Sequence, residues 1–332
     1  MSRPAVSIIA EAAQGYEGDP FVARLLVRAA AAGQADMVKF QLVYADELAT
    51  PEYPYYGLFK QLEMPDQAWG RVVEEAHQAK LGVVFDVYGL ASLRVALALG
   101  ADAVKIHATD FFNEPLADAA LVQVPRVFFS TGGITADEVD AFLARHAAAG
   151  DRLTLLYGFQ AEPTALEDNH LRRLTSLRAR FPRLALGFMD HADGEVDEAG
   201  WLGVLAVALG ATVIEKHVTL DRALKLEDSM SALTAAELGR YVARVRAAEA
   251  ALGTADLALT PAETAYRNRA IKVVVAARPL EAGATLAAAD VRLLRTVREQ
   301  DRAVFRRPEE VSGRRLARAL ARGQAIHPED LA

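Results

Sequence analysis

Eight short runs rich in β-branched and other apolar residues recur along the chain, and an Ala- and Leu-rich amphipathic stretch follows most of them. The runs are residues 6–12, 37–41, 83–87, 103–108, 127–131, 153–159, 184–191 and 212–218. Asp19 followed by Pro20 suits the start of a helix, and Thr135 with Glu138 forms a capping box. Strand and helix alternating eight times within roughly 250 residues predict an α/β fold, a (β/α)8 TIM barrel.

A doubly wound open sheet is the alternative fold for alternating strands and helices. Such a sheet commonly carries a glycine-rich phosphate loop directly after its first strand. Here the first run leads into EAAQGYEG at residues 11–18, which lacks the required glycine spacing. The barrel is therefore the favoured architecture.

The pattern changes after the last of these runs and its helix. Residues 1–252 are predicted to form the barrel domain, and residues 253–268 have the composition of a linker. Residues 269–332 contain a β-branched run at 271–276, a second apolar run at 290–294 and no sizeable helix. We therefore expect a small β-rich domain, which would be marginal alone and should dock on another surface.

Composition narrows the class of protein. The 332 residues are 52% hydrophobic, enough for a large core, and the net charge of -7 argues against nucleic-acid binding. The absence of Cys excludes disulfides, thiolate metal sites and a cysteine nucleophile. No apolar run reaches about 18 residues, and the first residues, MSRPAVSIIAEA, lack a signal-peptide layout. We expect a cytoplasmic protein without a membrane partner.

Polar residues stand near the carboxyl end of every predicted strand. They are Glu11, Lys39, Gln41, Asp86, Lys105, His107, Ser130, Thr131, Tyr157, Gln160, Asp190, His191, Glu215 and His217. The active site of a TIM barrel is built at this end of its strands. Any one of these residues could be a rim salt bridge, but their presence on all eight strands indicates a functional site.

Two histidines at the ends of neighbouring predicted strands are candidate metal ligands. His191 ends one run, and His217 shares a face of the next run with Glu215, because side chains alternate along a strand. Two imidazoles that leave other positions open to water and substrate suit a divalent metal. The alternative is that both histidines are hydrogen-bonded rim residues.

Other strand-end residues suit an anionic substrate. The donor-rich set comprises Lys39, Lys105, Ser130 and Thr131, with two glycines at positions 132 and 133. Such groups bind phosphate and carboxylate, although the lysines could instead pair structurally with Glu11 and Asp86. The carboxylates of Glu11, Asp190 and Glu215 are available for acid–base work or for orienting the histidines.

Over essentially its whole length the chain resembles the sialic acid synthase family. The matching segments are IIAEAAQGYEG (8–18), VKFQ (38–41), VKIHATD (104–110), FFSTGGIT (128–135), LLYGFQAEPT (155–164), MDHA (189–192) and, most specifically, EKHVTLDRALKLEDSMSAL (215–233). Residues 273–295 and 321–331 resemble the antifreeze-like (SAF, β-clip) domain that follows the barrel in that family. The resemblance implies condensation of phosphoenolpyruvate with an N-acyl aldohexose, such as N-acetylmannosamine, to a nonulosonic acid with release of phosphate.

The resemblance also implies a role for individual residues. His191 and His217 fall on manganese ligands, with magnesium as the alternative metal. Glu11 falls between the two reacting substrates, with Asp190 and Glu215 in supporting catalytic roles. Lys39, Lys105 and Ser130 fall on phosphoenolpyruvate contacts, and Gln41, Glu162, Asp228 and Arg295 fall on positions that face the sugar. From their place at or just after the strand ends, we add Thr131 and Gln160 to the phosphoenolpyruvate residues and Tyr157 to the sugar residues. Arg295 of the partner subunit would reach into the barrel, which implies a homodimer with swapped C-terminal domains.

The chain departs from the family pattern near the expected site. His107 and Ala108 stand where the family commonly has Gly-Ser, Met189 replaces a serine, Gln160 an asparagine, Glu162 a tyrosine and Thr296 a proline. The metal and lysine residues are retained, so we expect the reaction to be retained and the sugar specificity to differ.

Two other functions stay open at this point. One is a different phosphoenolpyruvate-dependent 3-deoxy-ulosonate synthase or aldolase, against which the antifreeze-like tail argues. The other is a sugar-binding paralogue of altered specificity or without turnover, suggested by Ala108, Met189 and Glu162.

Overall fold

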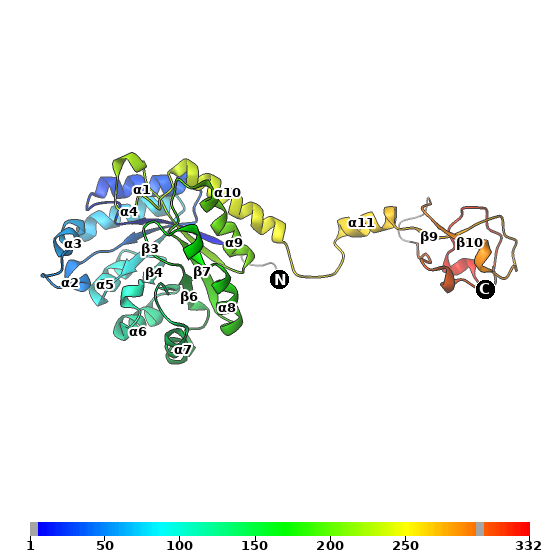
Figure 1. Ribbon diagram of the computed structural model, residues 1–332, viewed down its shortest axis with the longest axis horizontal. Helices are drawn as coiled ribbons and strands as arrows, with labels where there is room; N and C mark the ends of the chain where they lie inside the picture. The colour runs from blue at the N-terminus through cyan, green and yellow to red at the C-terminus, as the bar shows by residue number, and fades with distance from the viewer. Residues whose placement is uncertain (1–5, 297–301) are drawn as a thin grey trace. The chain divides into compact units, whose positions relative to one another are not determined.

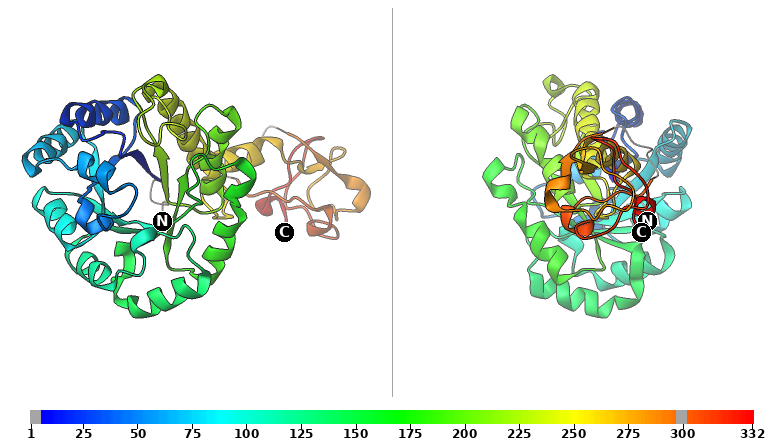
Figure 2. Two further views of the ribbon diagram at one scale, coloured as in Figure 1. Left: turned by 60° about the vertical axis from the view of Figure 1, so that its left-hand side comes forward. Right: turned by 90° about the vertical axis from the view of Figure 1, so that its right-hand side faces the viewer.

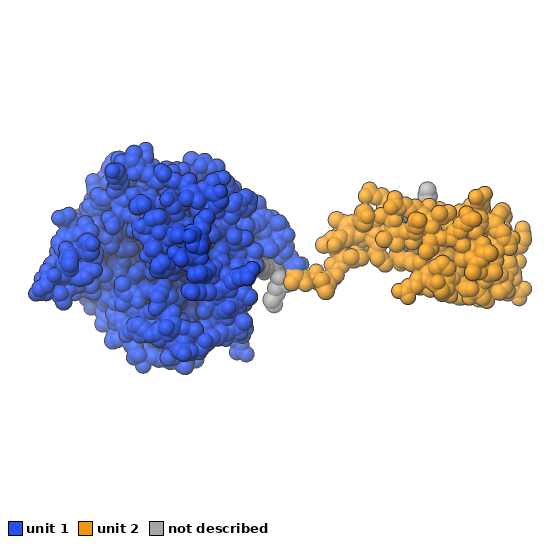
Figure 3. All heavy atoms as spheres, viewed as in Figure 1, with its two compact units in different colours: residues 1–254 blue, residues 255–332 orange. Residues whose placement is uncertain are grey.

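The computed structural model describes residues 6–296 and 302–332. Residues 1–5 lie outside the described residues. They are part of the N-terminal segment from which we expected no signal peptide. The chain divides into two compact units, residues 1–254 and residues 255–332 (Figure 3).

The first unit is built on a closed, parallel eight-stranded barrel with the strands in sequence order (Figures 1 and 2). The strands are β1 (Ser7–Ala13), β2 (Met37–Gln41), β3 (Gly82–Val87), β4 (Ala103–Ile106), β5 (Val127–Ser130), β6 (Leu153–Tyr157), β7 (Ala185–Asp190) and β8 (Val213–His217). The barrel closes through pairing of Ser7 with Val213 and of Glu11 with His217. The predicted (β/α)8 barrel is confirmed.

Helices surround the barrel on its outer face, as the left view of Figure 2 shows. They are α1 (Pro20–Ala32), α2 (Ala45–Leu48), α3 (Tyr56–Leu62), α4 (Asp66–Gln78), α5 (Leu90–Ala98), α6 (Glu114–Gln123), α7 (Ala136–Arg145), α8 (Arg172–Arg180), α9 (Leu202–Ala208) and α10 (Ala235–Leu252). The predicted helix starts are confirmed, because Asp19 accepts a hydrogen bond from Phe21 N and Thr135 with Glu138 forms a capping box. The short helices α2 and α3, between β2 and α4, had no counterpart in the sequence prediction.

The barrel has two apolar layers, one on each face of the sheet. Between sheet and helices, the indole of Trp69 on α4 packs edge-on against Tyr16, Phe40 and Phe85, with ring centroids 5.0 to 5.5 Å apart. Inside the barrel, one residue from each strand fills the axis. These residues are Ile9, Met37, Val84, Ala103, Phe128, Leu156, Met189 and Val213. The interior is therefore a packed core at this level, and the barrel can open to ligands only beyond it.

The second unit contains α11 (Pro261–Ala270) and an antiparallel pair of strands, β9 (Val273–Ala276) and β10 (Val291–Leu294). Its core gathers Val274, Leu286, Val311, Leu316 and Ile326. The β-rich character expected for this part of the chain is confirmed. Helix α11 lies within the range 253–268 and just beyond it, a range that the sequence analysis assigned to a linker.

None of the helices in the described ranges 6–296 and 302–332 is both long enough and apolar enough to cross a membrane.

Candidate active site

A layer of polar side chains lies directly above the apolar axis of the barrel, at the carboxyl ends of the strands. Because side chains alternate along a strand, the residue two positions after each axial residue also points inward. These positions are Glu11, Lys39, Asp86, Lys105, Ser130, Gly158, His191 and Glu215. The register places Glu11 beside Lys39 and Asp86 beside Lys105. The barrel topology therefore brings eight separated sequence positions into one ring, which carries a polar side chain at every position except Gly158.

The floor of this ring is a buried cluster of two ammonium groups and three carboxylates. Lys39 Nζ forms ion pairs with Glu11 and with Asp86 (2.5 Å), and it lies 3.6 Å from Glu215. Lys105 Nζ lies 2.7 Å from Glu215 Oε1. All five side chains are at most 3% exposed, so water contributes little to their stabilisation. This cluster is consistent with both interpretations of the lysines, contact with the substrate and structural pairing with carboxylates.

Unequal charge in this cluster decides which carboxyl group keeps a proton. Burial raises the pKa of Glu11 to about 8, because the attraction of Lys39 does not offset desolvation and the repulsion from Glu215 and Asp86. Burial opposes ionisation of Glu215 as well, but Lys105 and Lys39 lower its pKa to about 2. Glu11 is therefore the proton-carrying group of the cluster near neutral pH, and Glu215 stays ionised.

His191 and His217 lie side by side at the same end of the barrel. Their ring centroids are 4.9 Å apart at an interplanar angle of 64°. Burial lowers the pKa of His191 to about 3 and, with His191 and the lysines nearby, that of His217 well below its ordinary value, so both rings are neutral at pH 7. His191 Nδ1 and His217 Nε2 are buried and have no hydrogen-bond partner.

Two neutral imidazoles, each with a buried nitrogen left without a partner, fit the donor set of a divalent metal. Within residues 6–296 and 302–332, no cluster of three or more His, Cys, Asp or Glu side chains is arranged to hold a metal ion. The side chains of His191 and His217 are therefore the protein donors available for such an ion, and its other positions would be left to water or substrate.

A second set of polar side chains lies one step further out along the strands. Ser130 Oγ is 3.3 Å from the amide oxygen of Gln160, and Gln160 Nε2 is 3.0 Å from His107 Nε2. At the end of β2, Gln14 Nε2 donates to Gln41 Oε1 at 2.7 Å. The expected phosphoenolpyruvate residues Ser130 and Gln160 are thus brought together, and His107 joins them.

Three residues predicted for the site lie on the opposite, helix-facing side of the sheet. Tyr157 Oη donates to the Asn169 carbonyl at 2.9 Å, and Thr131 Oγ1 donates to the Leu156 carbonyl at 3.2 Å. Asp190 is fully buried and accepts hydrogen bonds from Lys216 Nζ at 3.0 Å and Tyr241 Oη at 2.9 Å. Their place near the carboxyl ends of predicted strands had suggested a shared site, but strand alternation turns them outward. This corrects the predicted catalytic placement of Asp190 and the substrate-facing placement of Thr131 and Tyr157.

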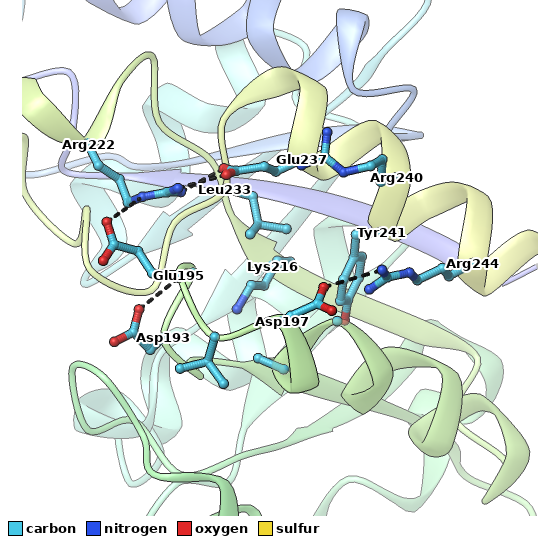
Figure 4. A pocket seen from close by; sticks show the side chains of 14 residues that line it. Asp193, Glu195, Asp197, Lys216, Arg222, Leu233, Glu237, Arg240, Tyr241 and Arg244 are labelled. Carbon is cyan, nitrogen blue, oxygen red and sulfur yellow. Dashed lines mark hydrogen bonds and ion pairs between the residues drawn. The ribbon is translucent and has the colours of Figure 1, made fainter.

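Lys216 and Tyr241, which the sequence analysis did not single out, belong to this outer network. They line a pocket of about 370 Å³ outside the barrel (Figure 4). Lys216 Nζ also donates to the Ala192 carbonyl at 2.7 Å, and Asp190 pairs in register with Lys216. The network therefore ties together the strand ends that carry His191 and His217. Because side chains alternate along β8, Glu215 and His217 point inward and Lys216 points outward. This alternation was the signal in the sequence for the outward-facing network.

The predicted sugar residues Glu162 and Asp228 lie at the rim near His217. Asp228 Oδ2 is 4.0 Å from His217 Nδ1, and Glu162 Oε1 accepts a hydrogen bond from Ser231 N at 2.9 Å. Burial, with repulsion from Glu162 and Glu227, raises the pKa of Asp228 to about 7. Arg295 belongs to the second unit, where its Nε donates to the Ala270 carbonyl at 2.9 Å. Its role as a residue offered to a neighbouring barrel stays a prediction.

Comparison with known proteins gives two family matches on this chain. The model of the NeuB family matches residues 26–256, and the model of the SAF domain matches residues 271–332. The chain is 29% identical over 294 residues to N-acetylneuraminate-9-phosphate synthase from Mus musculus, covering 84% of this chain and 80% of that protein. It is 30% identical over 312 residues to N,N'-diacetyllegionaminic acid synthase from Legionella pneumophila, covering 87% and 85%.

A solved structure shares both fold and sequence with the chain. The crystal structure of N-acetylneuraminic acid (sialic acid) synthetase from Leptospira borgpetersenii in complex with citrate superposes with a TM-score of 0.73 at 26% identity. The match covers 80% of this chain and 92% of that one.

Proposed function

Because this chain belongs to the NeuB family, we propose that it is a nonulosonic acid synthase that condenses phosphoenolpyruvate with an N-acyl aldohexose and releases phosphate. The relatives from mouse and Legionella carry the names of synthases for two such acids. The observation that carries the proposal is one group of side chains, called the hollow below: two neutral imidazoles (His191 and His217), two buried lysines (Lys39 and Lys105) and a protonatable Glu11 lie at the same end of one barrel.

The charge of the hollow supports a substrate pair that arrives with a metal ion. Three carboxylates face two lysines, so the floor carries one excess negative charge, or none when Glu11 is protonated. A phosphate and a carboxylate on one substrate would gain little attraction from such a floor alone. A divalent ion on His191 and His217, manganese in our proposal with magnesium as the alternative, would add two positive charges and, when bound, polarise the acceptor carbonyl.

The residues of the hollow then have distinct tasks. Lys39, Lys105 and Ser130 would hold the phosphate and carboxylate of phosphoenolpyruvate so that its C3 faces the aldehyde carbon of the open-chain sugar. A bond forms between these two carbons, and the aldehyde oxygen takes a proton, for which Glu11 is the protonated group at hand. Water adds at C2 of the former phosphoenolpyruvate, and phosphate leaves by cleavage of the C–O bond, which yields the 2-keto acid.

The acceptor sugar would occupy the rim. We assign Gln41, Glu162 and Asp228 to this sugar. Glu162 and Asp228 lie close enough for their charges to interact, and Glu162 is one of the residues by which the chain differs from the family pattern. We include Arg295 of the partner subunit in the acceptor site, in a homodimer with exchanged C-terminal domains. In this proposal the separate small domain that follows the barrel would complete the acceptor site of the partner subunit.

A panel experiment tests the proposal. The purified chain is incubated with phosphoenolpyruvate, MnCl2 and one of several aldoses, including N-acetylmannosamine, its 6-phosphate and 2,4-diamino-dideoxy hexoses with N-acetyl groups. Released phosphate is measured and the product mass is determined by mass spectrometry. We expect release with at least one N-acyl hexose and a product mass equal to sugar plus pyruvate. Binding of sugars without release in any reaction would instead indicate a sugar-binding paralogue.

A further inference from the structure

His107 occupies an inward-facing position above Lys105, at the phosphate side of the hollow. His107 follows Lys105 by two residues, so its side chain points to the same face as that of Lys105. Its ring centroid is 6.4 Å from the ring centroid of Tyr88. The backbone N–H of Thr109 lies 3.3 Å from His107 Nδ1. A backbone amide can only donate, so Nδ1 must be the unprotonated, accepting nitrogen of the ring.

The hydrogen of the neutral ring is therefore on Nε2, which faces Gln160. Burial lowers the pKa of His107 to about 4, so the imidazole carries a single hydrogen at neutral pH. The nitrogen atoms His107 Nε2 and Gln160 Nε2 are 3.0 Å apart, and two donors cannot bond to each other. The contact becomes a hydrogen bond when the Gln160 amide is rotated by a half turn, so that its oxygen accepts from the imidazole.

This rotation also settles what Ser130 does. The amide NH2 of Gln160 then faces Ser130 Oγ, which was 3.3 Å from the amide oxygen. Ser130 Oγ accepts this hydrogen bond, and its own hydroxyl hydrogen is left to point into the hollow. Gly132 permits the approach, since a Cβ there would lie 2.7 Å from the Gln160 amide oxygen atom. The four groups form one directed chain of donors from Thr109 N through His107 and Gln160 to Ser130.

We infer that His107 is a positioning residue that orients Gln160 and Ser130 as hydrogen-bond donors toward the phosphate group of the substrate. The identification of that phosphate as part of phosphoenolpyruvate rests on the proposed function. The lysines beneath are matched by carboxylates, so neutral donors of fixed direction carry much of the oxyanion recognition. In the opposite direction, His107 Nδ1–H would donate to Thr109 Oγ1, and Ser130 would donate its hydroxyl hydrogen to Gln160. Ser130 would then present a lone pair, which repels phosphate, and Thr109 N would lose its acceptor.

The test compares His107→Phe, which keeps an aromatic ring without nitrogens, with His107→Gln, whose amide can donate to Gln160. Binding of inorganic phosphate and of phosphoenolpyruvate is measured by calorimetry, and KM is measured separately for phosphoenolpyruvate and for the sugar. His107→Phe no longer orients Gln160 and Ser130 as donors, so we expect it to bind inorganic phosphate and phosphoenolpyruvate about 5- to 10-fold more weakly. The KM for the sugar should be unchanged. His107→Gln should recover most of this loss. His77→Gln, a change at a histidine paired with Asp102 away from the mouth, is the matched control.

A second measurement needs no variant. The tautomer of His107 in the wild-type protein is read from two-bond 1H–15N correlations, and we expect hydrogen on Nε2 and none on Nδ1. An Nδ1–H tautomer, or unchanged phosphate affinity in a folded His107→Phe protein, would overturn the inference. Calorimetry with inorganic phosphate needs no turnover, so the two proposals can fail separately. If phosphate binding depends on His107 but the wild-type protein releases no phosphate from phosphoenolpyruvate, the proposed function is wrong and this inference is retained.

Discussion

The imidazole rings of His191 and His217 lie 4.9 Å apart, and each keeps a buried nitrogen without a hydrogen-bond partner. A protein does not leave such groups unpaired without cost, since a buried polar atom that lacks a partner destabilises the fold by about 1–3 kcal/mol. His191 belongs to the same inward-facing ring as Lys39, Lys105 and Glu11, and the lysines lie close enough to contribute to the lowered pKa of His217. We propose that these nitrogens are satisfied by a metal ion that both rings bind.

Glu11 gives the reaction its alkaline limit. Its pKa is raised to about 8, so the protonated form that we assign to proton transfer is lost as pH rises through that value. We expect kcat/KM to fall above about pH 8, and Glu11→Gln to lower kcat by roughly 10²- to 10⁴-fold with little change in KM for phosphoenolpyruvate. A pH–rate profile of both proteins checks this. A Glu11→Gln enzyme with the wild-type rate would remove Glu11 from the mechanism.

The same shift predicts a dependence of stability on pH. A carboxyl group with a raised pKa binds its proton more tightly in the folded state than in the unfolded state. Its stabilising contribution is therefore complete below pH 4.5, the ordinary pKa of the group, and is lost as the pH rises toward about 8. The free energy of unfolding, measured by urea titration, should therefore decline less over this range in Glu11→Gln than in the wild type. Identical slopes for the two proteins would show that the Glu11 pKa is not raised.

Lys216 and Asp190 should act on stability rather than on chemistry. Both side chains are at most 2% exposed, and Lys216→Met leaves the Asp190 carboxylate buried with only Tyr241 and Ala192 N as donors. We expect a loss of about 3–5 kcal/mol of unfolding free energy, because a buried ion pair has lost one partner. Asp193→Asn, in the loop that lines the same outer pocket, serves as the control. A Lys216→Met protein of wild-type stability but without turnover would return this pair to the catalytic site.

Glu162 is expected to select the acceptor sugar. Its carboxyl group accepts a hydrogen bond from Ser231 N and lies close enough to Asp228 to raise the pKa of that group, and no ion pair links it to Lys39 or Lys105 among the described residues. Glu162→Tyr should change the ratio of kcat/KM between two acceptor sugars by roughly 10-fold or more, with KM for phosphoenolpyruvate within about 2-fold. Glu167→Gln in the same loop provides the comparison. An unchanged acceptor ratio would place the determinant elsewhere.

The sequence was sufficient for the barrel and for the inward-facing residues. Helix caps such as Thr135 with Glu138 and the alternation of strand residues are local signals, and Glu11, Lys39, Lys105, His191 and Glu215 follow from them. Tyr157, Thr131 and Asp190 were assigned because they stand near the carboxyl ends of predicted strands, and there the one-residue alternation of a strand turns their side chains to the other face. The hydrogen-bond chain through His107 depends on distances between three strands and their loops, which no local pattern contains.

The metal-binding role of His191 and His217 is the central claim, and one paired measurement tests it most directly. Mn2+ binding is followed by electron paramagnetic resonance in wild type and His217→Ala, and phosphate release from phosphoenolpyruvate with the active sugar is recorded on the same samples. We predict tight Mn2+ binding and metal-dependent release in the wild type, and loss of both in a folded His217→Ala protein. Wild-type Mn2+ affinity and near wild-type phosphate release in His217→Ala would contradict the account.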